Sequence, residues 1–227
     1  MHLANEWRDV LKEQKQAHDS KRSFAKLFEF LGDGDFWTAP ASTRFHSNFE
    51  GGLAYHSMKV AKNLELFTSV HDLEWDDPLS PYVIGLCHDV CKTGVYKREY
   101  RSQRKKRPDG TFVEGVNGRA VWEDVLAYTF DDSNCPMGHG AKSVILTQKV
   151  FELTEQEVFC ILWHMGGSEY GSNELGLSGF GTACAKDVNV LWTHVADRLA
   201  ALEEDQEAKQ ALLDAETRDD VGVGIDS

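Results

Sequence analysis

The feature that most constrains this chain is a histidine and an aspartate placed side by side in an apolar run. The run reads "GLCHDVCKTG" and spans residues 85–94. Its apolar positions have helical spacing, so His88 and Asp89 are expected to be buried. An isolated buried carboxylate is strongly destabilising. The sequence therefore predicts that the fold brings a cationic partner to Asp89.

Local signals predict where this helix begins and ends. Ser80 and Pro81 are typical of an N-cap and a first helical position, and Gly94 is a typical stop. The predicted helix spans residues 81–93. The missing side chain of Gly85 is expected to leave room beside the imidazole one turn later.

Other segments repeat the periodicity of an amphipathic helix. His56 lies on one such stripe, three residues after Leu53, and is expected to point inward. A capping box formed by Thr154 and Glu157 marks the start of another helix. The further predicted helices span residues 20–31, 53–67, 140–151, 155–165 and about 183–205. The Gly-rich segment 166–181 is expected to be a loop.

Residues 95–130 break the helical pattern. Turn signals "DG" and "NG" at 109–110 and 117–118 separate short runs that contain Val, Phe, Trp and Tyr, which predicts a β-hairpin-like insertion. Its first arm carries "KREYRSQRKKR", residues 97–107, with seven Lys or Arg and one Glu. This run is interpreted either as an ordinary solvated loop or as a guide for a phosphate-rich substrate.

Length and charge restrict the class of protein. We expect one all-α domain over residues 1–205 with the insertion at 95–130, followed by an acidic, flexible tail at 206–227. The net charge of −13 argues against a protein that coats nucleic acid. The polar start and the lack of a long apolar run predict a cytoplasmic protein without a membrane partner. Five cysteines fit reduced core thiols better than disulfides.

Six residues in these settings have side chains that bind metal ions. Imidazole together with carboxylate suits a divalent transition metal, and the lack of a thiolate cluster argues against a structural zinc site. Each histidine alone is more typical of ordinary packing, but six such residues together favour a metal centre. The six residues are His56, His88, Asp89, His139, His164 and Asp197. His194, one turn before Asp197, is expected either to hold a carboxylate in orientation or to pack without a special role.

The order of these residues along a helical chain resembles that of the HD superfamily of metal-dependent phosphohydrolases, and is most similar to bacterial and phage HD hydrolases. The matching stretches lie between residues 51 and 202. They are "GGLAYHS", "GLCHDVCKTG", "MGHGAKS", "ILWHMGG" and "HVADRLAA". The resemblance implies an HD-domain helical bundle and a metal site, and says less about the substrate.

The resemblance also implies a role for each of the six residues. His56, His88, Asp89 and Asp197 match the ligands of one metal ion. His139 and His164 match the additional ligands of dinuclear members, with Asp89 as the bridge. Many of those members have a second histidine where this chain has Met165, which argues against a third ion. One or two ions are expected, and Mn, Fe, Co, Ni, Zn and Mg are not distinguished.

The function implied is hydrolysis of a phosphate ester in a nucleotide or at the end of a short oligonucleotide by metal-activated water. Asp89, Lys92, His139 and His164 would take part in catalysis. Substrate contacts are expected from Lys92, Arg44, His46, Arg101 and Arg104. Two alternatives are a di-iron oxygenase of the same superfamily acting on a polyol or phosphonate, and a sensor module without turnover. A homo-oligomer is left open.

Overall fold

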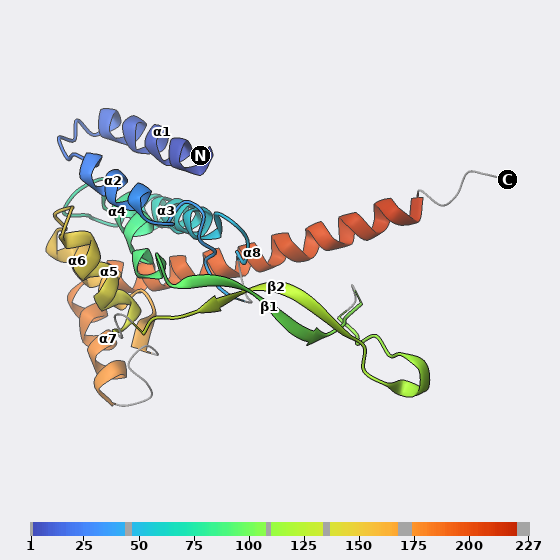
Figure 1. The fold of residues 1–227 in the computed structure, drawn as a ribbon. Coiled ribbons are helices and arrows are strands. Elements are labelled where there is room, and N and C mark those ends of the chain that lie inside the picture. Colours follow the sequence, from blue (N-terminus) through green and yellow to red (C-terminus); the bar gives the residue numbers. More distant parts are fainter. Residues whose placement is uncertain (1, 44–46, 108–109, 134–136, 168–173, 222–227) are drawn as a thin grey trace.

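The computed structural model describes residues 2–43, 47–107, 110–133, 137–167 and 174–221, and it is mostly helical. Figure 1 shows a helical body from which a hairpin and the end of the last helix project. The helical elements are α1 (His2–Ala17), α2 (Ala25–Asp33), α3 (Gly52–His71), α4 (Ser80–Cys87), the 3₁₀ helices η1 (Val90–Lys92) and η2 (Val116–Gly118), α5 (His139–Gln148), α6 (Glu155–Trp163), α7 (Glu174–Lys186) and α8 (Val188–Val221). Within the described residues, no helix has the length and apolar character needed to cross a membrane.

Helix α3 organises the core because it packs against α4 on one side and α8 on another, with α1 above it. Its Leu53 and Leu64 are fully buried, as are Ile84 and Leu86 of α4. The indole of Trp7 in α1 donates a hydrogen bond of 3.2 Å to the carbonyl of Ala54. The prediction of a helix over 53–67 is confirmed within a slightly longer element.

The predicted capping box at the start of α6 is confirmed, and it also joins distant parts of the chain. The Thr154 side chain accepts from the Glu157 N–H, and the Glu157 carboxylate accepts from the Thr154 N–H. The buried Glu157 carboxylate further accepts hydrogen bonds from Arg22 at 2.6 Å and from the Ser80 hydroxyl at 2.9 Å. The cap therefore fixes α6 against the start of α4.

The helix predicted over 81–93 is shorter than expected. Helix α4 ends at Cys87, and Asp89 has a non-helical backbone (φ −113°, ψ 17°) before the single 3₁₀ turn of η1. A Cβ atom on Gly85 would lie 2.6 Å from the Cβ of Ala61 and 2.7 Å from its backbone nitrogen. This glycine lets α4 approach α3, and the expectation that it makes room for the imidazole is wrong.

Three other expectations about helix boundaries differ from the structure. Helix α2 begins at Ala25 rather than at 20. Helix α7 begins at Glu174, inside the segment 166–181 where a loop was expected, and a Cβ on Gly179 would lie 2.6 Å from the Trp163 ring. A separate helix then starts after Asp187, whose carboxylate accepts from the Asn189 N–H at 2.8 Å. This last helix, α8, continues to Val221 and so extends into the segment 206–227 that was expected to be a flexible tail.

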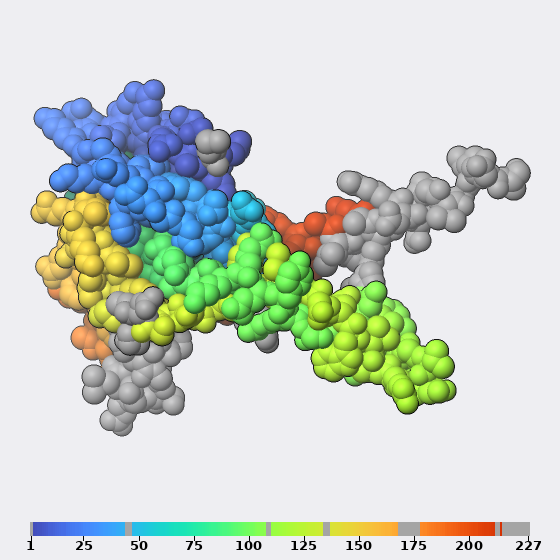
Figure 2. Space-filling view, in the orientation of Figure 1, coloured from blue at the N-terminus to red at the C-terminus, as the bar shows by residue number. Residues whose placement is uncertain are grey.

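The predicted hairpin is present as an antiparallel pair of strands, β1 (Tyr96–Arg104) and β2 (Trp122–Phe130). Tyr96 pairs with Phe130 at the base, and Arg104 pairs with Trp122 toward the tip. Asn117 and Gly118 both have positive φ, as the "NG" turn signal predicts. Figure 2 shows the hairpin, in green to yellow-green, standing out from the helical body.

The cysteines lie mainly in the helical body. Cys87, Cys91 and Cys160 are buried free thiols, and Cys184 is half-buried. Cys135 lies outside the described residues.

Candidate metal centre

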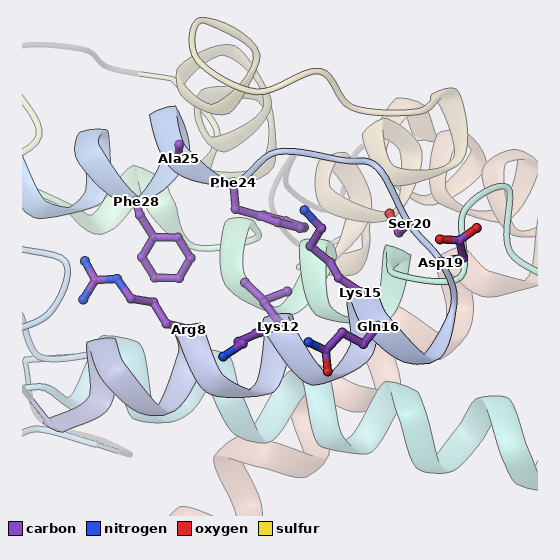
Figure 3. A pocket seen from close by; sticks show the side chains of 10 residues that line it. Arg8, Lys12, Lys15, Gln16, Asp19, Ser20, Phe24, Ala25 and Phe28 are labelled. Atoms are coloured by element: carbon purple, nitrogen blue, oxygen red, sulfur yellow. The ribbon is translucent and has the colours of Figure 1, made fainter.

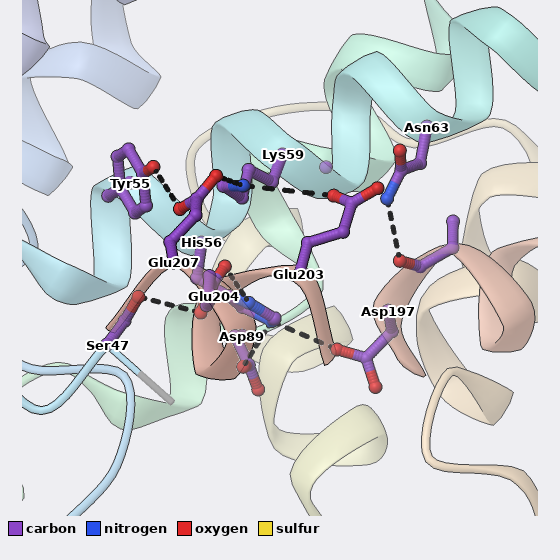
Figure 4. Close-up of polar contacts among 12 residues, drawn as sticks. Ser47, Tyr55, His56, Lys59, Asn63, Asp89, Asp197, Glu203, Glu204 and Glu207 are labelled. Carbon is purple, nitrogen blue, oxygen red and sulfur yellow. Dashed lines mark hydrogen bonds and ion pairs between the residues drawn. The ribbon is translucent and has the colours of Figure 1, made fainter. Parts of the chain in front are cut away.

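Five of the six predicted metal-binding residues come from the ends or the middle of four helices that meet in the interior. His56 lies on α3, His88 and Asp89 follow α4, His164 follows α6, and Asp197 lies on α8. The three histidines are fully buried, and Asp89 and Asp197 are nearly so. Figure 4 shows His56, Asp89 and Asp197 directed toward one another from different elements.

One half of this cluster is formed by His56, His88 and Asp197, whose donor atoms all lie within 4.8 Å of one another. The Asp197 Oδ1 atom lies 3.0 Å from His56 Nε2 and 3.7 Å from His88 Nε2. Three such donors around one point could hold a metal ion.

Asp89 connects that half to a second set of donors. Its Oδ2 atom lies 3.4 Å from His88 Nε2, whereas its Oδ1 atom lies 3.5 Å from His164 Nε2. Donor atoms of Asp89, Cys91 and His139 also lie within 4.8 Å of one another. The two carboxylate oxygens therefore face different histidines, which is the arrangement that a bridging ligand requires.

The hydrogen bonds of two histidines determine which ring nitrogen faces the cluster. His88 Nδ1 lies 2.9 Å from the Gly85 carbonyl, and His164 Nδ1 lies 2.8 Å from the Ile161 carbonyl. Because a carbonyl only accepts, Nδ1 carries the proton in both rings, and Nε2 presents a lone pair when the ring is neutral.

Several buried polar atoms of the cluster lack a hydrogen-bond partner among the described residues. They are His88 Nε2, His164 Nε2, His139 Nδ1 and Asp89 Oδ1. Buried polar atoms are ordinarily satisfied, and a ring lone pair that faces a carboxylate repels it unless the ring is protonated or a metal cation lies between them. The residues present thus fit a divalent cation.

Charges around the cluster shift the pKa values of its members. Burial lowers the pKa of His56, but hydrogen bonds with Asp197 and Glu204 outweigh it and raise this pKa to about 9. Burial likewise lowers the pKa of His164, and the Asp89 carboxylate raises it above its ordinary value. Burial raises the pKa of Asp197, whereas His56 lowers it more strongly, so this carboxyl stays ionised.

Lys92 lies at the edge of the cluster, in an ion pair with Asp89. Its Nζ lies 2.7 Å from Asp89 Oδ2, and the side chain is only 12% exposed. Burial lowers the pKa of Lys92, but Asp89 raises it above its ordinary value, and Lys92 in turn holds the pKa of Asp89 well below its usual range despite burial. Its contact with a substrate stays a prediction.

Two residues near the cluster were not identified from the sequence. Glu204 is buried on α8, two turns after Asp197, and its carboxylate lies 3.0 Å from His56 Nδ1 and accepts from Ser47 Oγ at 2.7 Å. Glu204 lies seven residues after Asp197, and this helical spacing could have indicated that both carboxylates share one face of the helix. The second missed residue is Cys91. Burial raises the pKa of its thiol to about 12, which opposes binding of a metal ion by the thiolate at neutral pH.

His194 contacts a backbone carbonyl oxygen, whereas contact with a carboxylate was one of the two expectations. Its Nδ1 lies 2.7 Å from the carbonyl oxygen of His164, and its ring packs on Gly166, where a Cβ would lie 3.0 Å from Cε1. The expectation that His194 orients a carboxylate is therefore wrong. It holds the backbone of a histidine in the cluster instead.

The remaining predicted contact residues are not placed in the cluster. Arg44 and His46 lie outside the described residues. Arg101 and Arg104 lie on the half of β1 that is remote from η1, and the Arg104 guanidinium stacks on Phe112 at 4.4 Å. Their role toward a substrate stays a prediction.

A separate hollow of about 550 Å³ lies between α1 and α2. Figure 3 shows Arg8, Lys12 and Lys15 around it, with Phe24 and Phe28 behind them. It shares no residue with the histidine and aspartate cluster, so we do not assign the chemistry to it.

Comparison of the chain with protein-family models, with curated proteins and with solved structures gave no match.

Proposed function

We propose that this protein is a metal-dependent phosphohydrolase that cleaves a phosphate ester of a nucleotide or short oligonucleotide. The ligands would be His56, His88, Asp89, His139, His164 and Asp197. The observation that carries the proposal is the buried pair of Nε2 atoms on His88 and His164. They face opposite oxygens of one carboxylate at 3.4 and 3.5 Å, and neither has a hydrogen bond among the described residues. The likeness of the sequence to HD phosphohydrolases supports the choice of phosphate esters.

A charge network without a metal is the main rival explanation of the cluster. Lys92 neutralises Asp89, and His56 can share a proton with Asp197 and Glu204. That network reaches Asp89 Oδ1 only through His164 Nε2 at 3.5 Å, and neither atom has a hydrogen-bond partner among the described residues. A cation between these atoms accounts for both, so we favour a metal centre.

The chain's own residues would prepare this centre for reaction. Carbonyl oxygens of Gly85 and Ile161 fix the rings of His88 and His164, and Glu204 fixes the ring of His56. A bound divalent ion would supply an acidified water and neutralise charge on the phosphoryl oxygens. The Lys92 ammonium stays charged beside Asp89, where it can hold a non-bridging oxygen of the substrate.

The decisive experiment is product analysis by mass spectrometry after Mn²⁺-loaded protein is incubated with nucleoside mono- and triphosphates, cyclic dinucleotides and short RNA. We expect cleavage of at least one class, lost in Asp89→Ala and in His164→Ala, and retained in His18→Ala. His18 is an exposed histidine that follows α1, so it is a matched control for removal of an imidazole. Circular dichroism would verify that each variant is folded.

Failure would redirect the assignment in a defined way. Bound iron with oxygen uptake on a polyol or phosphonate, and no phosphate release, would identify the oxygenase of the same superfamily. Full metal loading without turnover on either panel would identify a sensor module. Equal metal content in wild-type protein and Asp89→Ala would overturn the metal centre itself.

A further inference from the structure

The two faces of the hairpin differ in composition. Side chains of directly paired residues in an antiparallel ladder point to the same side, and alternate pairs share that side. One face therefore carries the five pairs Tyr96–Phe130, Arg98–Tyr128, Tyr100–Leu126, Ser102–Asp124 and Arg104–Trp122. We call these ten residues the aromatic face.

Much of the aromatic face is open to solvent. Tyr100 is 77% exposed and Trp122 is 62% exposed, and Leu126 and Phe130 are nearly half exposed. The opposite face carries Val125 and Ala127, which are only partly exposed. Large aromatic side chains thus stand on the more exposed side of the sheet, where they contribute little to folding.

Positive charge is interleaved with these rings. The Arg98 guanidinium lies 5.4 Å from the centre of the Tyr128 ring, and Arg104 stacks on Phe112. The segment 97–107 holds seven of the 24 Lys and Arg of an acidic chain with a net charge of −13. The register places Arg98 and Arg104 on the aromatic face, beside Asp124, and Lys97 and Arg101 on the opposite face. Arginine and aromatic rings on one surface are the groups on which nucleic-acid bases stack and to which phosphates bind.

The base of the aromatic face adjoins the metal cluster. Phe130 and His139 have ring centres 6.3 Å apart, and Tyr96 and Phe130 have ring centres 5.7 Å apart. At about 3.4 Å per residue, the strand from Trp122 to Phe130 spans roughly 27 Å. The face is therefore a continuous track from the distal half of the hairpin to one of the candidate ligands.

We propose that the aromatic face binds single-stranded nucleic acid, with bases stacked on Tyr100 and Trp122 and phosphates held by Arg98 and Arg104. Single strands are favoured over duplexes because paired bases cannot open onto aromatic rings. A second copy is disfavoured as the occupant because it would bring an equal positive charge to the same surface. That the face guides a strand end to the cluster rests on the proposed function, whereas binding itself does not.

The test is fluorescence anisotropy with labelled oligo(U) and oligo(dT) of about 15 nucleotides, a length within the usual site sizes of such surfaces. EDTA in the buffer prevents cleavage and makes binding independent of the metal centre. We expect micromolar or tighter binding that weakens as salt rises, with a matched duplex binding more weakly. The ratio between oligo(U) and oligo(dT) would show whether RNA or DNA is preferred.

Conservative variants separate stacking from general apolar contact. Tyr100→Leu combined with Trp122→Leu should weaken binding by about tenfold or more, while Tyr100→Phe combined with Trp122→Phe should restore it. Arg98→Gln combined with Arg104→Gln should reduce the salt dependence by about one unit of logarithmic slope for each phosphate contact that is lost. Lys12→Gln combined with Lys15→Gln on α1 removes the same charge elsewhere and should leave binding unchanged.

Three results would overturn the inference. They are absence of salt-dependent binding, equal affinity for the duplex, and wild-type affinity in the double leucine variant. Sedimentation that shows a dimer dissociated by the leucine variant would assign the face to a second copy instead. Binding without cleavage of any phosphate ester would leave this inference standing and remove the proposed function, so the two fail separately.

Discussion

The candidate metal centre is rich in imidazole and carboxylate groups and the hairpin is rich in aromatic rings and arginines, yet the two regions are built in opposite ways. In the cluster, polar groups are buried among four helices and held by second contacts such as Glu204 on His56. In the hairpin, apolar rings are exposed on a two-stranded sheet that packs little against the body. Burial of polar groups in the cluster lowers stability but fixes their geometry. The exposed rings of the hairpin stay free to contact a partner and have little effect on stability.

This difference predicts which properties a substitution in each region will change. A change in the cluster should alter folding and metal binding together, because the same residues join the helices and form the site. A change on the aromatic face should alter binding alone. Substitutions in each region therefore test one side of this contrast.

The largest combined effect on stability and metal binding is expected from Gly85→Ala. The added Cβ would collide with the backbone of Ala61, which cannot move without separating α3 from α4 and hence His56 from His88. We expect a loss of about 3 kcal/mol in the free energy of unfolding, together with weaker metal binding. Chemical denaturation and metal titration would measure both.

Gly32→Ala is the matched control for that substitution. Gly32 lies in α2, and a Cβ atom added there would meet no neighbouring group within 4 Å, so the substitution should be neutral or stabilising by up to about 1 kcal/mol. Equal stability of the two variants would show that α3 and α4 are not held as closely as the structure indicates.

The second prediction concerns pH in metal-free protein. The pKa of His56 is raised from its ordinary value of 6.5 to about 9, so its stabilising contribution is complete below about pH 6.5 and is lost as pH rises toward 9. The contribution is on the order of 3 kcal/mol. His164, whose pKa is also raised, acts in the same direction.

Denaturation midpoints measured in EDTA between about pH 6 and pH 9.5 would reveal this loss. Protons and metal compete for the same imidazoles, so metal affinity should rise over the range in which metal-free stability falls. A His56→Gln variant should lack most of the slope. A flat profile in the wild-type protein would mean that His56 does not carry a proton between Asp197 and Glu204.

Much of the cluster was predictable because helical periodicity alone indicates which side chains point inward. His56 shares a stripe with Leu53, and the capping box at Thr154 fixes the start of the helix that leads to His164. What periodicity could not supply is the partner of each residue. Gly85 was assigned to the imidazole although it faces Ala61, since nothing local identifies a neighbour on another helix.

The other errors have a similar origin. The glycines of α7 were interpreted as loop residues, but Gly179 packs closely on Trp163, and tertiary contact overrides the low helix propensity of glycine. Glu204 falls near the end of the helix predicted over about 183–205, and its role was missed because its burial depends on α3 and Ser47, which are far away in sequence. The basic hairpin was found from composition, but its aromatic face depends on the strand register.

A third prediction compares two neighbouring glutamates on α8. Glu204→Ala removes the carboxylate that holds His56 Nδ1, so metal affinity should fall by about 10–100-fold with the fold retained. Glu203→Ala removes an exposed carboxylate 3.8 Å from Lys59 and should change affinity little. Isothermal titration with Mn²⁺ would measure the two constants. Equal affinities would exclude a positioning role for Glu204.

The smallest effect is expected on the aromatic face. Leu126→Ala removes a side chain that is 46% exposed, so the free energy of unfolding should change by no more than about 0.5 kcal/mol. The same substitution at the fully buried Leu86 of α4 should cost about 2–5 kcal/mol. Guanidinium denaturation of both variants gives the comparison directly. A loss above about 1 kcal/mol for Leu126→Ala would mean that another part of the protein covers the face, and that its rings serve folding rather than recognition.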